Sequence, residues 1–171
     1  MKKALIIIDM QKGFINENTE HLIDKIEEFA IKGNFHYIIG TRYINSELTA
    51  CYKFEGWKDC MLGSEESHIV TKLSRICDEV VDKNKYSCWN EDFKDILKEE
   101  EIDQLVFVGV NTGCCVLASV LNAYDDVYDV VVIKDLCGST NGLDAHIRGL
   151  QVLEDCITKE RVITSKEYLQ R

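Results

Sequence analysis

The sequence has no proline, no long apolar run and no excess of basic residues. Without proline, sharp turns must depend on glycine, asparagine or aspartate, and any cis peptide bond is a non-proline one. The apolar run in MKKALIIID ends at Asp9, too early for a secretory signal or a membrane span. A net charge of −10 excludes the basic surface that nucleic acids and anionic membranes require. We therefore expect a cytoplasmic protein without nucleic-acid or membrane partners.

Metal-binding motifs are also absent, although the chain has eight cysteines. No CxxC pair occurs and the four histidines are scattered, so the spacing of a structural zinc site is missing. Disulfide frameworks are typical of small secreted chains, and in a cytoplasmic protein of 171 residues we expect reduced thiols. We predict neither a metal nor a cofactor.

Short apolar runs alternate with segments of helical period, a pattern typical of βαβ units around a parallel sheet. The expected strands are residues 4–8, 36–41, 79–82, 105–110, 129–134 and 161–164. The expected helices are residues 19–32, 71–76, 91–100, 114–124 and 143–156, the first capped by Asn18 or Thr19. We predict one α/β domain over residues 1–171, with a three-layer α/β/α, doubly wound, mostly parallel six-stranded sheet in the order 3-2-1-4-5-6.

The segment 42–66 has no clear period and carries four aromatic residues. A loop of that length inside a compact domain is more often functional than idle. We expect this segment to contribute to substrate selection.

Reactive residues come directly after the predicted strands, where doubly wound sheets bind their ligands. Asp9 ends the first strand, Lys83 ends the third, and Cys114 and Cys115 come after the fourth. In a first helical turn, free N–H groups and a nearby ammonium lower the pKa of a thiol from about 8.5. An aspartate that accepts the thiol proton completes the parts needed for acyl transfer. Spacing alone does not choose between the two cysteines, or between Lys83 and Lys85.

Four segments, ALIIIDMQKGF, VVDKNKYSCW, GVNTGCCVLASVLNA and DLCGSTNGLDAH, resemble the isochorismatase-like cysteine hydrolase superfamily. They occur in the order and spacing of that family and cover nearly the whole chain. The resemblance implies a catalytic triad of Asp9, Lys83 and Cys115. It selects Lys83 because this lysine stands three residues before Tyr86, and Cys115 because a valine comes after it.

The resemblance also implies details of the surrounding site. A cis peptide is expected at Val110–Asn111, with the N–H groups of Asn111 and Cys115 holding an oxyanion. His146 matches a family histidine for which we favour a packing role. Gly113 replaces the usual family aspartate, which leaves open how this turn is braced.

We therefore predict a metal-independent hydrolase that cleaves an amide or carbamoyl C–N bond of a small molecule. Metal-dependent members carry histidines after the second strand, whereas this chain reads TRYINSE there. Retention of Cys115 favours C–N cleavage, because members that hydrolyse isochorismate commonly lack the cysteine. Phe14, Tyr43 and Trp89 are expected to contact the substrate, and Arg42 is a candidate partner for a substrate carboxylate. Like its relatives, the chain is expected to form a dimer or a larger homo-oligomer.

Two alternatives stay open. One is a non-amide hydrolase of the vinyl-ether type, which would release no ammonia. The other is a thiol redox or binding protein that uses the adjacent Cys114 and Cys115.

Overall fold

A computed structural model describes residues 1–171, and its centre is a six-stranded sheet. The strands are β1 (Lys3–Ile8), β2 (Tyr37–Tyr43), β3 (Glu79–Lys83), β4 (Gln104–Val110), β5 (Asp129–Gly138) and β6 (Val162–Ile163). They lie in the order β3-β2-β1-β4-β5-β6, and every neighbouring pair runs parallel. This confirms the predicted order. The switch point, where the strand order reverses and such sheets bind their ligands, lies between β1 and β4.

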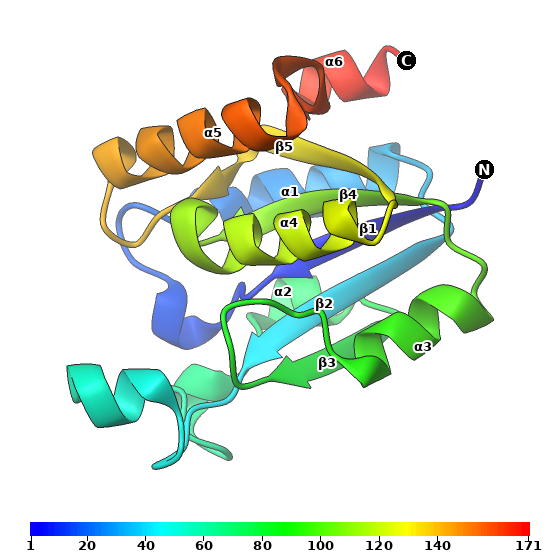
Figure 1. Ribbon diagram of the computed structural model, residues 1–171. Coiled ribbons are helices and arrows are strands. Elements are labelled where there is room, and N and C mark those ends of the chain that lie inside the picture. Colours follow the sequence, from blue (N-terminus) through cyan, green and yellow to red (C-terminus); the bar gives the residue numbers. More distant parts are fainter.

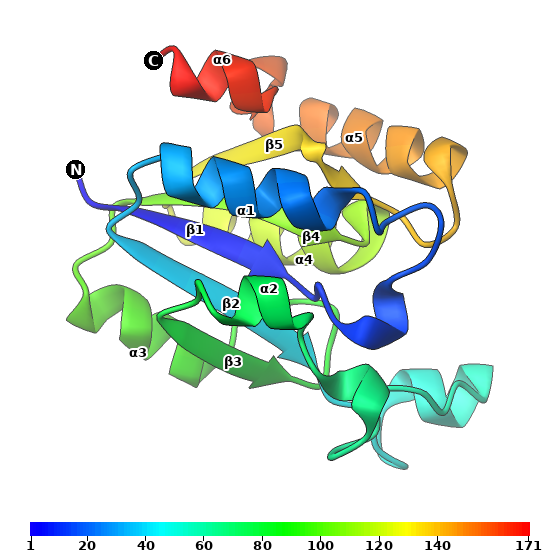
Figure 2. The same ribbon diagram turned by 180° about the vertical axis from the view of Figure 1, so that it is seen from behind.

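Helices cover both faces of the sheet and complete the predicted three layers. They are α1 (Leu22–Lys32), α2 (Thr71–Ser74), α3 (Glu91–Glu99), α4 (Leu117–Asp125), α5 (Leu143–Ile157) and α6 (Ser165–Leu169). Figure 1 shows α3, α4 and α5 on one face, and Figure 2 shows α1 and α2 on the other. None of the helices combines the length and apolar character needed to cross a membrane.

Five short helical turns connect these elements. They are η1 (Lys12–Phe14), η2 (Cys51–Glu55), η3 (Glu65–Ser67), η4 (Thr112–Val116) and η5 (Lys159–Arg161). Of these, η2 and η4 are π-helical, and η4 runs directly into α4.

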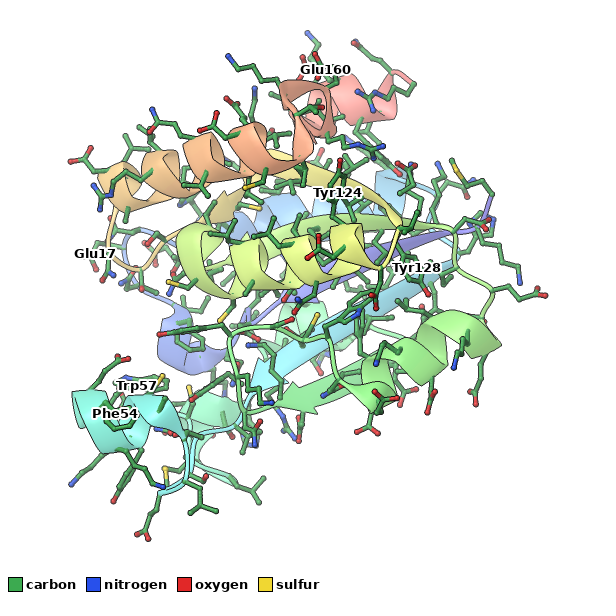
Figure 3. All side chains as sticks on the ribbon, in the orientation of Figure 1. Glu17, Phe54, Trp57, Tyr124, Tyr128 and Glu160 are labelled. Carbon is green, nitrogen blue, oxygen red and sulfur yellow. The ribbon has the colours of Figure 1, made fainter.

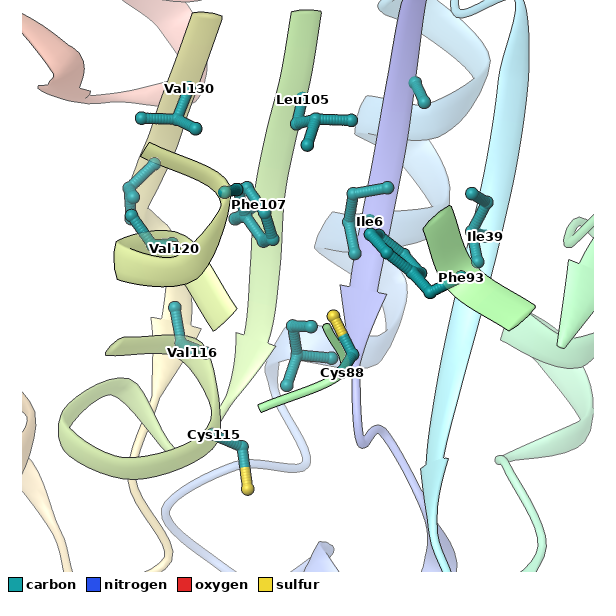
Figure 4. Close-up of a cluster of buried hydrophobic side chains, with 14 of the residues drawn as sticks. Ile6, Ile39, Cys88, Phe93, Leu105, Phe107, Cys115, Val116, Val120 and Val130 are labelled. Atoms are coloured by element: carbon teal, nitrogen blue, oxygen red, sulfur yellow. The ribbon is translucent and has the colours of Figure 1, made fainter. Parts of the chain in front are cut away.

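Two apolar cores lie on opposite faces of the sheet. Because successive strand side chains alternate in direction, Ile6 and Ile8 enter one core while Leu5 and Ile7 enter the other. Figure 4 shows Ile6 and Phe107 in the first core, which α3, α4 and α5 close. Burial on both faces explains why β1 and β4 are continuous apolar runs rather than alternating ones.

The start of α1 differs from the prediction. Neither Asn18 nor Thr19 caps this helix, because the N-cap position is His21, which makes no capping hydrogen bond. Thr19 Oγ1 instead donates to the carbonyl oxygen of Phe14 at 2.7 Å. The hydroxyl therefore holds the segment that carries Phe14 against the beginning of α1.

The end of β5 also differs from the prediction, since the strand continues past residue 134 to Gly138. The carbonyl oxygen of Gly138 accepts a hydrogen bond of 2.9 Å from Thr112 Oγ1. The extension therefore ties β5 to η4. The C-terminal helix α6 has no counterpart among the predicted elements.

The segment 42–66 protrudes beyond the carboxyl ends of β1 and β2, where η2 appears in cyan (Figure 1). Figure 3 shows Phe54 and Trp57 in this protruding part. The side chain of Asn45 pins the segment, because its Nδ2 donates to the carbonyl oxygens of Trp57 and Asp59 at 2.9 and 3.0 Å. One buried amide thus sets where Trp57 lies relative to the strand ends.

Candidate active site

A buried ion pair lies at the carboxyl ends of the strands. Lys83 Nζ lies 2.7 Å from Asp9 Oδ2, and the two side chains are only 2% and 1% exposed. Lys83 ends β3 and reaches across β2, where its ammonium lies 5.2 Å from the centre of the Tyr43 ring. The ammonium also donates to the carbonyl oxygen of Lys85 at 3.0 Å. A charge pair so far from solvent is costly unless each member is well satisfied.

The two oxygens of the Asp9 carboxylate differ in what they bind. Oδ1 accepts a 2.7 Å hydrogen bond from Thr41 Oγ1, a side chain of β2. Oδ2 contacts the ammonium of Lys83 at 2.7 Å and has no further hydrogen-bond partner. Because a carboxylate oxygen can accept more than one hydrogen, Oδ2 can still receive a proton.

Cys115 faces this pair from the other side of the switch point. It lies in η4, directly after β4, and is 6% exposed. Figure 4 shows its sulfur near the strand ends, at the edge of the apolar core. Cys114, the adjacent residue, is exposed, as expected because neighbouring helical residues diverge by about 100°. Of these two adjacent cysteines, Cys115 interacts with both Asp9 and Lys83, whereas Cys114 interacts with neither.

The thiol of Cys115 is protonated in the resting site. Burial raises its pKa well above the ordinary value, and Asp9 raises it further while Lys83 opposes both effects. The lowered thiol pKa expected from the sequence is therefore wrong, because loss of solvent outweighs the ammonium. Burial alone would lower the pKa of Lys83, but Asp9 and Cys115 raise it, so the ammonium stays charged.

The turn that carries Cys115 is held by Thr112 and His146. Thr112 Oγ1 donates to the Gly138 carbonyl oxygen and lies 2.7 Å from His146 Nδ1. The hydroxyl of Thr112 has one hydrogen, which it donates to the carbonyl oxygen of Gly138. Nδ1 of His146 must therefore be the donor in the second hydrogen bond. Burial lowers the pKa of His146, so the ring is neutral at neutral pH.

Close backbone packing explains how the turn at Gly113 is braced without the family aspartate. A Cβ built on Gly149 in α5 would meet the backbone nitrogen of Gly113 at 2.6 Å. The backbone of α5 therefore packs directly on η4, at a distance that only glycine at position 149 permits. A Cβ on Gly113 would meet Gly149 Cα at an ordinary 3.5 Å.

A cavity of about 280 Å³ opens beside Cys115. Its lining residues come from η1, η2, the strand ends and the loop after β5: Phe14, Tyr43, Cys51, Glu55, Trp57, Tyr86, Asn111, Cys114, Cys115, Thr140 and Asn141. The structure thus brings the predicted substrate contacts Phe14, Tyr43 and Asn111 together with Cys115. The Phe14 and Trp57 rings stack with centroids 5.6 Å apart and planes 22° from parallel.

Asn111 is held firmly at the edge of this cavity. The Val110–Asn111 peptide bond is cis, as the family resemblance implied. Asn111 Oδ1 accepts a 2.7 Å hydrogen bond from the backbone N–H of Thr140. The backbone N–H of Asn111 has no acceptor within the protein. It is therefore available to a substrate oxygen.

Two candidate residues from the sequence do not line this cavity. Trp89 lies away from the cavity, where it packs against Phe93 and donates through Nε1 to Asp126 at 2.6 Å. It lies two residues before α3 in sequence and packs on the core through the rings of Phe93 and Tyr128. Arg42 is occupied by a bidentate pair with Asp82, at 2.7 and 2.8 Å, and does not line the cavity.

Sequence reasoning missed Glu55, Tyr86 and Cys51 as lining residues. Tyr86 belongs to the quoted Lys-x-x-Tyr-Ser pattern, so a signal for it existed. Glu55 and Cys51 carry no such signal, because their position depends on how η2 folds over the strand ends. No group of three or more His, Cys, Asp or Glu side chains is arranged to hold a metal ion.

Fold and site together define a doubly wound α/β protein with a cysteine beside a buried aspartate–lysine pair. The chain belongs to the isochorismatase family, since the family model described as Isochorismatase domain matches residues 3–167. The comparison with curated proteins gives no match.

Solved structures of this family share the fold over nearly the whole chain. An isochorismatase-like hydrolase from Alkaliphilus metalliredigens is 25% identical, with a TM-score of 0.86 and coverage of 99% of this chain and 98% of that one. A cysteine hydrolase from Pseudomonas syringae is 18% identical, with a TM-score of 0.84 and coverage of 99% and 91%. A nicotinamidase from Bacillus subtilis is 20% identical, with a TM-score of 0.80 and coverage of 96% and 100%. The chain is therefore similar to hydrolases throughout its length.

The packing of α5 on η4 yields a matched pair of substitutions. Gly149→Ala should lower the free energy of unfolding by about 1–2 kcal/mol, because overpacking against backbone exceeds the gain in helix propensity. Gly113→Ala should change it by less than about 0.5 kcal/mol, since its Cβ has room. Urea denaturation of both variants measures the difference, and a Gly149→Ala variant as stable as the native chain would contradict the packing argument.

Proposed function

We propose that the protein is a metal-independent cysteine hydrolase that cleaves the C–N bond of a small amide or carbamoyl compound through a thioester intermediate. Asp9, Lys83 and Cys115 are the proposed catalytic residues. The observation that carries the proposal is the buried Oδ2 of Asp9, whose one contact is the Lys83 ammonium, together with a Cys115 thiol on whose pKa Asp9 and Lys83 act in opposite directions. Such an oxygen suits a base that must receive one proton.

In the first half-reaction, Asp9 accepts the proton of the Cys115 thiol while the sulfur attacks the carbonyl carbon. The C–N bond then breaks, and the leaving nitrogen takes the proton from Asp9. The products are the amine, or ammonia from a primary amide, and a thioester on Cys115. The backbone N–H of Asn111, which has no acceptor in the protein, is proposed to donate a hydrogen bond to the oxyanion of the tetrahedral intermediate.

In the second half-reaction, a water molecule attacks the thioester carbonyl. Asp9 takes a proton from this water, and the C–S bond breaks to release the acid. The proton returns to the sulfur, which restores the thiol and the carboxylate. One carboxylate thus serves as base and acid in turn.

Lys83 keeps the charge of the buried site balanced during the proton transfer. Before transfer its ammonium faces a carboxylate and a neutral thiol, and after transfer it faces a neutral acid and a thiolate. The three groups carry the same total charge in both states, so the transfer leaves no unpaired charge in the buried site.

Several observations favour C–N cleavage over the alternatives. The thiol is retained, buried and placed beside a base, as nucleophilic acyl transfer requires. Among similar structures is a nicotinamidase from Bacillus subtilis, which supports the same class of bond for this chain. A vinyl-ether hydrolase would need no such thiol, and a redox role for Cys114 and Cys115 would leave the Asp9–Lys83 pair without a purpose.

Replacing the nucleophile is the sharpest test of this function. Cys115→Ala should lower ammonia release from small primary amides by about 10³-fold or more, because no thioester forms. Cys114→Ala should keep activity within about tenfold, since it removes only a lining thiol. Steady-state ammonia release measures both variants, with circular dichroism to verify folding. An active Cys115→Ala variant would show that Cys115 is not the nucleophile.

Metal independence has its own test. A chelator such as EDTA should leave ammonia release unchanged, because the segment after β2 offers no histidine and the site works by proton transfer. The enzyme is assayed before and after dialysis against the chelator, with zinc added back as the second arm. Activity that falls on dialysis and returns with zinc would contradict the mechanism.

A further inference from the structure

The cavity beside Cys115 has one charged lining residue, Glu55. The remaining lining side chains are aromatic, amide, hydroxyl or thiol groups. Glu55 lies at the end of η2, in the protruding segment, and is exposed at the mouth of the cavity. No lysine, arginine or histidine lines the cavity to offset it.

The buried ion pair does not change the net negative charge of the cavity lining. Lys83 lies beneath the cavity and is paired with Asp9, so the two contribute no net charge. Arg42 is bound to Asp82 outside the cavity. Lys85 lines a separate depression that shares Tyr43, Cys51 and Tyr86 with the cavity, so the effect of its charge must be tested.

The field of Glu55 reaches the part of the cavity next to the nucleophile. Burial raises the pKa of Cys114, and Glu55 is the next largest cause of that increase. Burial raises the pKa of Tyr86 to about 12, with Cys51 and Glu55 adding to it. The carboxylate therefore acts on both walls of the cavity mouth.

Aromatic rings form much of the surface that faces this carboxylate. We name Phe14, Trp57 and Tyr86 the aromatic wall, since all three line the cavity. Phe14 and Trp57 stack on each other, and Trp57 also contacts Tyr43 at a centroid distance of 5.8 Å. Aromatic faces attract cations, Trp most strongly, and they bind methylated ammonium groups that are poorly hydrated.

We propose that the site selects small amides that carry a positive charge, in particular an ammonium or quaternary ammonium group held by Glu55 and the aromatic wall. The amide carbonyl then faces Cys115 while the cation lies toward the cavity mouth. Substrates with a carboxylate are disfavoured, because they meet Glu55 and find no basic partner. This inference rests on the proposed hydrolase function for its catalytic readout.

A set of three amides of similar size and different charge tests the inference. They are trimethylglycinamide, its uncharged carbon isostere 3,3-dimethylbutanamide, and the anion succinamate. We expect kcat/KM for ammonia release to fall in that order, with about two- to fivefold between the cation and its isostere, as for one exposed charge pair. Equal values for those two amides, or faster cleavage of the anion, would overturn the inference.

Variants in the same protein assign the effect to Glu55. Glu55→Gln should remove most of the preference for the cation, and Glu55→Lys should reverse it toward succinamate. The matched control is Glu47→Gln, which changes net charge equally in the same segment but does not line the cavity. Lys85→Gln should preserve or increase the preference. A preference that survives Glu55→Gln, or that Glu47→Gln removes equally, would refute the role of Glu55.

A labelling experiment separates this inference from the proposed reaction. In the Cys114→Ser background, Cys115 is modified with the cationic trimethylammonioethyl methanethiosulfonate or the anionic sulfonatoethyl reagent, and tandem mass spectrometry locates the label. The ratio of cationic to anionic rates should fall about three- to tenfold in Glu55→Gln. If no amide is cleaved but this ratio falls, the reaction is wrong and the charge selection stands. If amides are cleaved and the ratio is unchanged, the charge selection is wrong.

Discussion

The buried ion pair between Asp9 and Lys83 is the interaction on which the site depends. It joins the ends of β1 and β3 across β2, with Thr41 of β2 completing the shell around the carboxylate. Without Lys83 the carboxylate would be an uncompensated charge, and without Asp9 the ammonium would be. The pair also leaves Oδ2 able to accept one proton. The same carboxylate therefore holds the strand ends together and is available for proton transfer.

The scaffold brings Cys115 to this pair through backbone packing rather than through loop contacts. Gly149 lets α5 approach η4, and the Thr112 hydroxyl links η4 to both β5 and His146. Since α4 and α5 bury their apolar faces on the same core, the position of the thiol is set by the packing of these helices on the sheet. The protruding segment 42–66 supplies further lining side chains, including Glu55 and Trp57. In the proposed function, the protein core positions the reactive groups and this segment contributes to substrate choice.

Sequence reasoning captured the features that depend on periodicity and strand-end location. Continuous apolar runs at β1 and β4, with reactive residues immediately after the strands, predicted a doubly wound sheet and a site at the strand ends. The choice of Lys83 and Cys115 came from the family resemblance. The features that it missed depend on tertiary packing. The direction of the Cys115 pKa shift is set by burial, which no local pattern encodes, and Trp89 packs against Phe93 and Tyr128 instead of lining the cavity. Glu55 reached the cavity through the fold of η2, a segment without periodicity.

The central claim is that Asp9 and Lys83 act in opposite directions on the proton of Cys115. Alkylation by iodoacetamide across pH, with the label at Cys115 located by mass spectrometry, measures this directly in the native chain, Asp9→Asn and Lys83→Met. Because Asp9 raises the thiol pKa and Lys83 lowers it, the midpoint should move to lower pH in Asp9→Asn and to higher pH in Lys83→Met. Midpoints that stay at the native value, or that move together, would show that the pair does not control the thiol.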